Sequence, residues 1–366
     1  MPRTLKSDPV LFLATVTLVG LSIIMVWSAS AVVAMERYQQ PYLFLTKQMM
    51  WSGLGLAAMM TGASLDYHLF KQERVIWAGL GLVALCLIAV LFSPPVNNAR
   101  RWFSVGGLGI QPSELAKLIA IFFIASMLER RMHRINEVGY ALLPIGLVVG
   151  LLVGLILLEP DFGTSMSLAL IAGVMVFGAG LSYLYVLGAA ALAIPAGLLV
   201  MFGAAYRRAR FTAFLDPWAD PQGTGFQLIQ SLIAVATGGV TGRGLMQGVQ
   251  KLFFLPEPHS DFIYAVISEE LGLIGATAVL ICFCVITWRG LRVASNAPDT
   301  FGAFLALGLT TMISVQALVN ISVVLGLLPT KGIPLPFVSA GGSSLIINLL
   351  GMGVLLNVSR HASSTA

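Results

Sequence analysis

Charged residues are scarce in this sequence. Asp, Glu, Lys and Arg make up 10% of its 366 residues, whereas soluble domains carry about 25%. So few charges cannot cover the surface of a water-soluble globule, which rules out an ordinary cytosolic enzyme and a disordered chain. Cysteine is scarce as well, and Cys86, Cys282 and Cys284 all lie inside apolar runs. A secreted disulfide scaffold is therefore ruled out, and a cysteine metal site is disfavoured.

Apolar residues, by contrast, make up 57% of the chain. A membrane-spanning helix needs about 20 mostly apolar residues, and the uncharged runs of this sequence suit that length. One run is too long for a single helix and is divided at 178–182. Ten spans are predicted, at 10–35, 48–65, 75–99, 113–128, 138–158, two within 162–206, 271–288, 300–330 and 332–359. We therefore expect an all-α integral membrane protein with a single polytopic domain over residues 1–366.

The distribution of Lys and Arg predicts how the chain is inserted. The first apolar run is far longer than the ~7–15 residues of a cleavable signal sequence, so we expect an anchor. An even number of spans places both termini on one side, where ten Lys and Arg lie against five in the short loops opposite. Basic residues favour the cytoplasmic side, so both termini are predicted to be cytoplasmic. Because these residues form short clusters between apolar runs, no nucleic-acid partner is expected.

One connection is much longer than the others. Residues 204–260, between the seventh and eighth spans, are predicted to form an extracytoplasmic loop. Long loops without a function are uncommon. Within this one, 226–236 is apolar but too short to cross a bilayer, which predicts an interfacial or re-entrant helix.

Three acidic residues lie where this loop enters the eighth span. Asp261 could simply cap the helix, since Asp is a good N-cap residue. Glu269 and Glu270 follow in the same helix, and at 1.5 Å per residue Glu269 would lie about 12 Å deeper than Asp261. Buried acids are costly in a bilayer and need partners. We therefore favour a functional carboxylate at Asp261 over a cap.

A second charged group lies in the fourth span. Glu114 and Lys117 are three residues apart, on one helical face, and can pair. They are either a neutralised structural pair or part of the wall of a polar cavity, and the second interpretation is modestly favoured because an apolar pair would cost less. Lys117 is also predicted to pair with Glu269 or Glu270, which would fix the fourth span against the eighth.

Basic residues cluster on the predicted outer side. Arg101 and Trp102 lead into the fourth span, while Arg207, Arg208 and Arg210 open the long loop. Such residues are usually a solvated rim. Clustered Arg opposite a carboxylate suits an anionic phosphate group instead, because Arg binds phosphate through two parallel hydrogen bonds. The sequence has no P-loop, so ATP-driven chemistry is not expected.

Several of these segments together resemble the SEDS family (shape, elongation, division, sporulation) of peptidoglycan glycosyltransferases. The similar strings are RWF at 101–103, QPSELAK at 111–117, EPDFGT at 159–164, FLDP at 214–217, GTGFQ at 223–227, LPEPHSDF at 255–262, EELG at 269–272, PLPF at 334–337 and GGSS at 341–344. LPTKG at 328–332 and QGTG at 222–225 resemble the division branch, FtsW, more than the elongation branch, RodA. Ala340 departs from the family, which usually has Tyr there.

The resemblance implies polymerisation of lipid II into β-1,4 glycan strands at the outer face of the bacterial cytoplasmic (inner) membrane, in division or elongation. It also implies a class B penicillin-binding protein as partner, bound through transmembrane helices, and other division proteins at the septum. Asp261 matches the family's essential aspartate. The remaining candidates are Arg101, Trp102, Glu114, Lys117, Arg207, Arg208, Arg210, His259, Ser343 and Ser344 for substrate binding, and Asp161, Glu269, Glu270 and Lys331 in support.

The expected chemistry needs one base. Direct displacement at the anomeric carbon inverts configuration, and no second carboxylate is required as a nucleophile. Arg, Lys or a divalent cation, Mg²⁺ or Mn²⁺, would meet the charge of the departing pyrophosphate, although no metal ligands are assigned. A lipid II flippase is the main alternative, disfavoured because the charges gather at the outer face without an inverted repeat. A structural scaffold would leave Asp261 unexplained.

Overall fold

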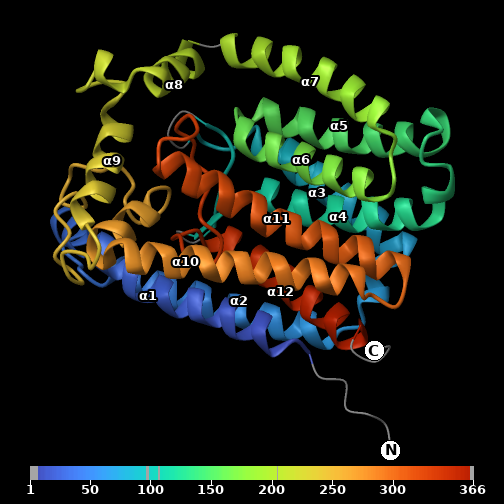
Figure 1. Cartoon of the computed structure of the whole chain (residues 1–366), viewed down its shortest axis with the longest axis horizontal. Coiled ribbons are helices and arrows are strands. Elements are labelled where there is room, and N and C mark those ends of the chain that lie inside the picture. The colour runs from blue at the N-terminus through green and yellow to red at the C-terminus, as the bar shows by residue number, and fades with distance from the viewer. Residues whose placement is uncertain (1–6, 96–98, 106–107, 204, 363–366) are drawn as a thin grey trace, which may run out of the picture.

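The computed structural model describes residues 7–95, 99–105, 108–203 and 205–362 (Figure 1). Within these residues the chain forms twelve α-helices and one antiparallel hairpin, β1–β2. The elements are α1 (Pro9–Tyr38), α2 (Leu43–Ser64), α3 (Glu73–Val90), β1 (Phe103–Val105), β2 (Leu108–Ile110), α4 (Pro112–Arg131), α5 (Leu143–Leu158), α6 (Phe162–Gly178), α7 (Tyr183–Phe202), α8 (Ala205–Leu215), α9 (Phe226–Gly238), α10 (Ile263–Ser295), α11 (Thr300–Val324) and α12 (Gly342–Ala362).

The helices confirm an all-α membrane architecture. Every predicted span overlaps a helix, from α1 to α7 and from α10 to α12. Among the described residues, six helices are long and apolar enough to cross a bilayer: α1, α3, α5 with the turn before it, α10, α11 and α12. The number of crossings, ten, stays a prediction.

The bundle is built around α12, which packs against α2, α4, α10 and α11. Most of its residues from Ser343 to Ala362 are buried, whereas α7 lies along one side of the bundle with largely exposed side chains. This difference follows from position, because a helix surrounded by other helices is apolar on all sides without contacting lipid. The exposed apolar surface of α7 is what a lipid-facing helix requires.

The last predicted span begins later than expected. The chain from Lys331 to Gly341 is not helical, and α12 starts at Gly342 rather than at residue 332. Pro334 and Pro336 explain the difference, because proline lacks the N–H that continues a helix. Irregular backbone of this kind is tolerated at membrane depth only where protein or a cavity surrounds it.

The segment 205–262 carries two short helices, α8 and α9. The helix expected at 226–236 is α9, which buries Ser231 and donates its hydroxyl to the Val324 carbonyl of α11 at 2.8 Å. With 13 residues it is about 20 Å long, less than the ~30 Å of a bilayer core. Its placement in or on the membrane stays a prediction.

α10 is broken at Gly272. This residue has φ 66° and ψ −164°, in a region of backbone space that glycine reaches and other residues avoid. The turn after α9 pairs with the break: the N–H of Leu273 donates to the Gly239 carbonyl at 2.9 Å, and the N–H of Gly244 to the Glu270 carbonyl at 3.0 Å. Residues before Gly272 therefore form a separate N-terminal segment of α10.

Candidate active site

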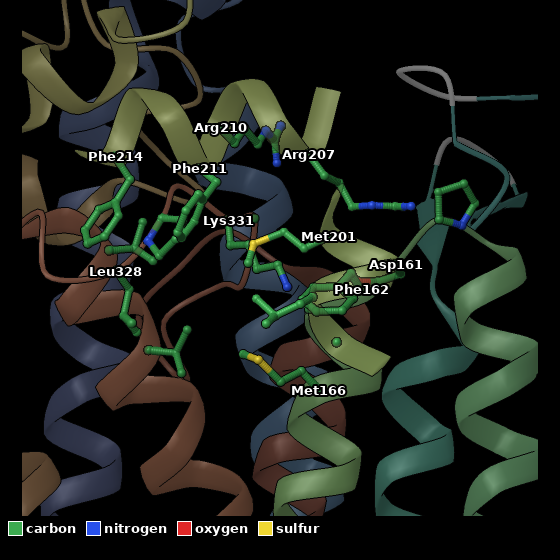
Figure 2. Close-up of a pocket in the computed structure, with 18 of the residues that line it drawn as sticks. Asp161, Phe162, Met166, Met201, Arg207, Arg210, Phe211, Phe214, Leu328 and Lys331 are labelled. Carbon is green, nitrogen blue, oxygen red and sulfur yellow. The ribbon is translucent and has the colours of Figure 1, made fainter. Parts of the chain in front are cut away.

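A cavity of about 590 Å³ lies between α6, α7, α8 and α11 (Figure 2). Its volume is within the usual range for a small-molecule site. Four cationic side chains and one carboxylate line it, and α7 and α11 supply an apolar wall. The charged lining residues are Arg101, Arg207, Arg210, Lys331 and Asp161. The cavity thus combines an excess of positive charge with a long apolar surface, as an anionic amphiphile would require.

α8 places two of its three arginines on the cavity. Arg207, Arg210, Phe211 and Phe214 lie on one helical face and line it. The cluster expected from the sequence is therefore divided, because Arg208 is exposed and does not line the cavity.

Lys331 extends into the cavity from the loop between α11 and α12 (Figure 2). Its Nζ lies 3.7 Å from the centre of the Phe162 ring and, within the described residues, has no hydrogen-bond partner. Burial, opposed by Asp161 and reinforced by Arg210 and Arg207, lowers the pKa of Lys331 to about 8. This ammonium has an aromatic face behind it and free donors for an anion.

Asp161 is held firmly at the N-terminus of α6. One of its oxygens, Oδ2, accepts hydrogen bonds from Thr164 Oγ1 at 2.7 Å and Gln111 Nε2 at 2.9 Å, while Oδ1 accepts from the Thr164 N–H at 3.1 Å. The Gln111 N–H donates to Ser343 Oγ at 3.2 Å. Asp161 and Ser343 therefore join the starts of α4, α6 and α12, and only Asp161 reaches the cavity.

Glu159 is a buried acid that offsets little of the positive charge of Arg101. Its side chain is fully buried, and neither carboxyl oxygen has a hydrogen-bond partner in the described residues. Burial first, and then the charge of Asp161, raise the pKa of Glu159 to about 8 against the effect of Arg101. With a pKa of about 8, Glu159 is mostly protonated at neutral pH and offsets little of the charge of Arg101.

Asp261 lies just before α10, and its carboxylate does not cap that helix. The N-cap residue is Phe262, without a side-chain hydrogen bond. The carboxylate adjoins the cavity through Gly332, a lining residue: a Cβ built on Gly332 would lie 2.8 Å from Asp261 Oδ2. Within the described residues no hydrogen bond to the two carboxyl oxygens of Asp261 is formed, so their lone pairs are free for a ligand.

The surroundings of Asp261 make it a stronger base than an exposed aspartate. Burial, and next the charge of Glu257, raise its pKa to about 6, while Arg101 and Arg210 act in the opposite direction and Asp161 adds a smaller rise. A base with a pKa near 6 is largely ionised at neutral pH and still accepts a proton readily.

The predicted pair in the fourth span is present. Lys117 Nζ lies 2.9 Å from Glu114 Oε1, and both side chains are almost fully buried. Neither residue lines the cavity described above. Their expected role in contacting substrate therefore stays a prediction.

The expected link from Lys117 to the acids of α10 is wrong. Glu270 pairs with Lys251 at 2.6 Å and accepts a hydrogen bond from Ser28 of α1, while Glu269 accepts the N–H of Val249 at 2.8 Å. The reason is the break at Gly272, where the chain after α9 folds over the N-terminal segment of α10 and supplies the partners of both acids.

Three further candidates also lie away from the cavity. The Trp102 ring packs against Gly109 of β2, where an added Cβ would lie 3.1 Å from it. The His259 ring is 4.6 Å from that of Phe44 in α2, and burial lowers its pKa. Ser344 accepts a hydrogen bond from Asn348 Nδ2 at 3.2 Å within α12.

The structure also brings residues to the site that the sequence did not single out. Phe162 and Gly332 line the cavity, and Asn320 contacts the backbone of Asp261. The one visible signal for Gly332 was its position directly after the candidate Lys331. For a metal, no group of three His, Cys, Asp or Glu side chains suited to hold an ion occurs in the part of the chain that the structure describes.

Fold and site together define a class: a multi-pass α-helical membrane protein whose cavity combines four cationic side chains with an apolar wall. The sequence pattern of the FtsW, RodA and SpoVE family, described as "Cell cycle protein", matches residues 9–364. This chain belongs to that family.

Curated relatives extend over the whole chain. A probable peptidoglycan glycosyltransferase FtsW from Geobacter sp. (strain M18) is 41% identical, with 100% of both chains covered. Stage V sporulation protein E of Bacillus subtilis (strain 168) is 43% identical, covering 98% of this chain and 99% of the relative.

Two solved structures have a similar fold. A chain of a peptidoglycan synthase complex is 32% identical with a TM-score of 0.80, covering 97% of this chain and 98% of the other. RodA of Thermus thermophilus is 28% identical with a TM-score of 0.71, covering 98% of each chain.

Proposed function

We propose that this chain is a peptidoglycan glycosyltransferase that polymerises lipid II into β-1,4 glycan strands and releases polyprenyl pyrophosphate. The observation that carries the proposal is a cavity with a basic end and an apolar wall, next to which the Asp261 carboxylate lies behind the lining residue Gly332 without lining the cavity itself. Relatives named as peptidoglycan glycosyltransferases support it. Their names do not favour a flippase.

The cavity matches the two chemical halves of the lipid-linked donor. Arg101, Arg207, Arg210 and Lys331 are placed to bind the pyrophosphate, for which Arg offers two parallel donors. The apolar side chains of α7 and α11 are placed to receive the start of the polyprenyl tail. Because charged and apolar surfaces are continuous, one ligand can occupy both.

The reaction needs one proton transfer and one displacement. Asp261 takes the proton of the acceptor sugar hydroxyl, and that oxygen forms a bond to the anomeric carbon of the donor. The bond from this carbon to the pyrophosphate oxygen breaks, and the departing electron pair is stabilised by the cations of the cavity. The configuration inverts, because a single displacement occurs without a covalent intermediate. A divalent cation stays a prediction, and no step above depends on one.

The partner and the location follow from the same family. A class B penicillin-binding protein, bound through transmembrane helices, would supply the transpeptidase. The similarity to a chain of a peptidoglycan synthase complex supports this assignment. We place the chain in the bacterial cytoplasmic membrane, at the division septum with other division proteins.

Purified protein in nanodiscs, with and without its partner, tests the activity on fluorescent lipid II. Asp261→Asn keeps the shape of the side chain and removes the base, so polymer formation should fall by about 100-fold or more. Asp216→Asn, at an exposed position of the same segment, is the matched control and should polymerise normally. A folded Asp261→Asn protein that polymerises at the normal rate contradicts the mechanism. Lipid II movement across liposomes without polymer would identify a flippase instead.

A further inference from the structure

Three consecutive backbone carbonyl groups, those of residues 259–261, accept hydrogen bonds from α11 and from the loop before α12. The N–H of Ala340 donates to the His259 carbonyl at 2.9 Å, Ser339 Oγ donates to the Ser260 carbonyl at 2.6 Å, and Asn320 Nδ2 donates to the Asp261 carbonyl at 2.9 Å. Two of these three donors are side chains, and both come from outside the segment that they hold.

Asn320 joins the two backbone segments that meet at the carboxylate. Its side chain is 1% exposed, and Nδ2 donates a second hydrogen bond to the Ile333 carbonyl at 2.8 Å. One amide group thus fixes Asp261 and the residue after Gly332 to the same point of α11. This bridge holds Gly332 against the carboxylate, where an added Cβ would lie 2.8 Å from Oδ2.

Ser339 has no freedom in how it donates. It is 3% exposed, and its oxygen accepts the N–H of Leu335 at 2.8 Å. The hydroxyl has one proton, which is therefore directed to the Ser260 carbonyl. The turn from Leu335 to Ser339, closed also by the Ser339 N–H on the Leu335 carbonyl at 3.0 Å, is a rigid support for residue 260.

Local hydrogen bonding fixes residues 259–261 only through a turn, in which the Ser260 N–H donates to the Glu257 carbonyl at 3.2 Å. Pro256 and Pro258 precede them, and α10 begins at Ile263 without a side-chain cap. Chain of this kind is mobile unless other groups bind its polar atoms. The placement of the carboxylate therefore depends on contacts made from α11 and from the loop before α12.

We propose that Asn320 and Ser339 are positioning residues that hold Asp261 against Gly332 at the cavity. This inference rests on the proposed function of Asp261 as the base. A displacement of about 1 Å costs an active site about 100-fold in rate, so a clamp on the backbone controls the reaction without touching the substrate.

The inference predicts a change in the titration of the base. When either donor is removed, its carbonyl partner must find water, and the segment moves away from Gly332 towards solvent. The charged groups that act on the pKa of the carboxylate are Glu257, Arg101, Arg210 and Asp161. As burial is lost, the pKa of Asp261 should fall towards that of an ordinary aspartate. The polymerisation rate falls when Asp261 becomes protonated, so this acid limb of the plot of rate against pH should move to lower pH.

Asn320→Ala, Ser339→Ala and the double variant test the proposal. Each should lower kcat for lipid II polymerisation about tenfold or more and change KM less than about threefold. Each should also move the acid limb to lower pH. Ser339→Thr keeps the hydroxyl and should restore most of the activity. Wild-type kcat and an unmoved limb in folded Asn320→Ala and Ser339→Ala would overturn the proposal.

Two buried residues provide matched controls. Asn357 is 2% exposed and also bridges two backbone groups, donating to the Ala63 carbonyl at 2.9 Å and accepting from the Tyr67 N–H at 3.1 Å. Ser231, on α9, donates to the Val324 carbonyl. Asn357→Ala and Ser231→Ala should lower the melting temperature as the test variants do, with kcat per folded molecule and the acid limb unchanged. If these controls move the acid limb as well, the clamp is not specific.

Hydrogen exchange separates this inference from the proposed function. Peptides covering 259–263 and 331–340 should exchange at least about tenfold faster in Asn320→Ala and Ser339→Ala than in the wild type, and not in the controls. Unchanged exchange overturns the clamp whatever the activity. If exchange rises but Asp261→Asn remains active, the clamp holds and the role of Asp261 as the base is what fails.

Discussion

Two ionisable side chains of the site have pKa values that move in opposite directions for the same reason. Burial raises the pKa of Asp261 to about 6 and lowers that of Lys331 to about 8. Neighbouring charges adjust both values: Glu257 adds to the rise for Asp261, and Asp161 opposes the fall for Lys331. Between the two values Asp261 is a carboxylate and Lys331 an ammonium, which are the states that a base and an anion-binding group require.

The rate of polymerisation should therefore have two limbs in pH. Below about pH 6 Asp261 becomes protonated, and kcat/KM should fall about tenfold per unit. Above about pH 8 Lys331 loses its charge, so the KM for lipid II should rise. Initial rates from pH 5 to 9.5, with lipid II below KM, measure both limbs.

A single substitution checks which residue causes the alkaline limb. Arginine stays charged throughout this range, so Lys331→Arg should remove the rise in KM above pH 8 and leave the acid limb in place. An alkaline limb that persists in Lys331→Arg would assign it to another group.

Gly332→Ala should disturb the base through shape alone. The added methyl group would lie 2.8 Å from Asp261 Oδ2, closer than van der Waals contact, and the short aspartate side chain cannot bend far away. We expect kcat to fall about tenfold to 100-fold while the melting temperature changes little. Gly146→Ala, where an added Cβ has no atom within 4 Å, is the control. Equal activity of the two variants would show that Gly332 does not contact the carboxylate in the working enzyme.

The sequence could predict the charged part of this site, but not its shape. Arg101, Arg207 and Arg210 were candidates because charge is rare and costly in a membrane protein, and all three line the cavity. Gly332 and Asn320 act through a close approach and a backbone hydrogen bond. Apart from the place of Gly332 beside Lys331, neither role leaves a pattern in the sequence, because each depends on how segments distant in the sequence fold together.

Among the helices, α10 differs most from its prediction. Its apolar run from residue 271 indicated a span, and a helix is there. The uncharged run does not indicate that Gly272 breaks it, or that the turn after α9 donates hydrogen bonds to carbonyls before the break and accepts them from N–H groups after it. Helices in a membrane are easy to locate because backbone groups must be paired internally, whereas a break is decided by what packs against it.

The buried pair that replaces the expected one should matter for stability. Lys251 and Glu270 are 3% and 0% exposed and 2.6 Å apart. Lys251→Met leaves a buried carboxylate without its cation, and removal of one partner of a buried pair costs about 3–5 kcal/mol. Thermal unfolding in detergent should show a marked fall in melting temperature.

The double variant Lys251→Met/Glu270→Gln should recover much of that loss, because no buried charge is then unpaired. The exposed pair Arg134 and Glu137 provides the comparison, and Arg134→Ala should have almost no effect. If Lys251→Met melts like the wild type, the pair does not hold the turn after α9 to α10.

The start of α1 and the last turns of α12 meet at one end of the bundle. The N–H of Asp8 donates to Ser359 Oγ at 3.1 Å, and Arg289 Nε donates to Asp8 Oδ2 at 2.7 Å. Figure 1 shows α8 and α9 at the other end, away from both termini. The predicted even number of crossings would place both termini on one side of the membrane, and the ten Lys and Arg expected on that side, against five opposite, predict that the end with Asp8 is cytoplasmic.

Cysteine labelling tests orientation and the placement of α9 together. In a variant with Cys86, Cys282 and Cys284 changed to Ala, a single cysteine is introduced as Gln222→Cys or Asn296→Cys, both at exposed positions. α9 and α10 lie between these positions. If α9 does not cross the bilayer, a membrane-impermeant maleimide should label Gln222→Cys on intact cells and Asn296→Cys only after permeabilisation. If α9 crosses, both positions lie on the same side of the membrane and label alike. Asp261, which lies between α9 and α10, would then be on the opposite side of the membrane from Gln222→Cys. The reverse pattern, with Asn296→Cys labelled on intact cells, would invert the molecule and place the cavity on the cytoplasmic side.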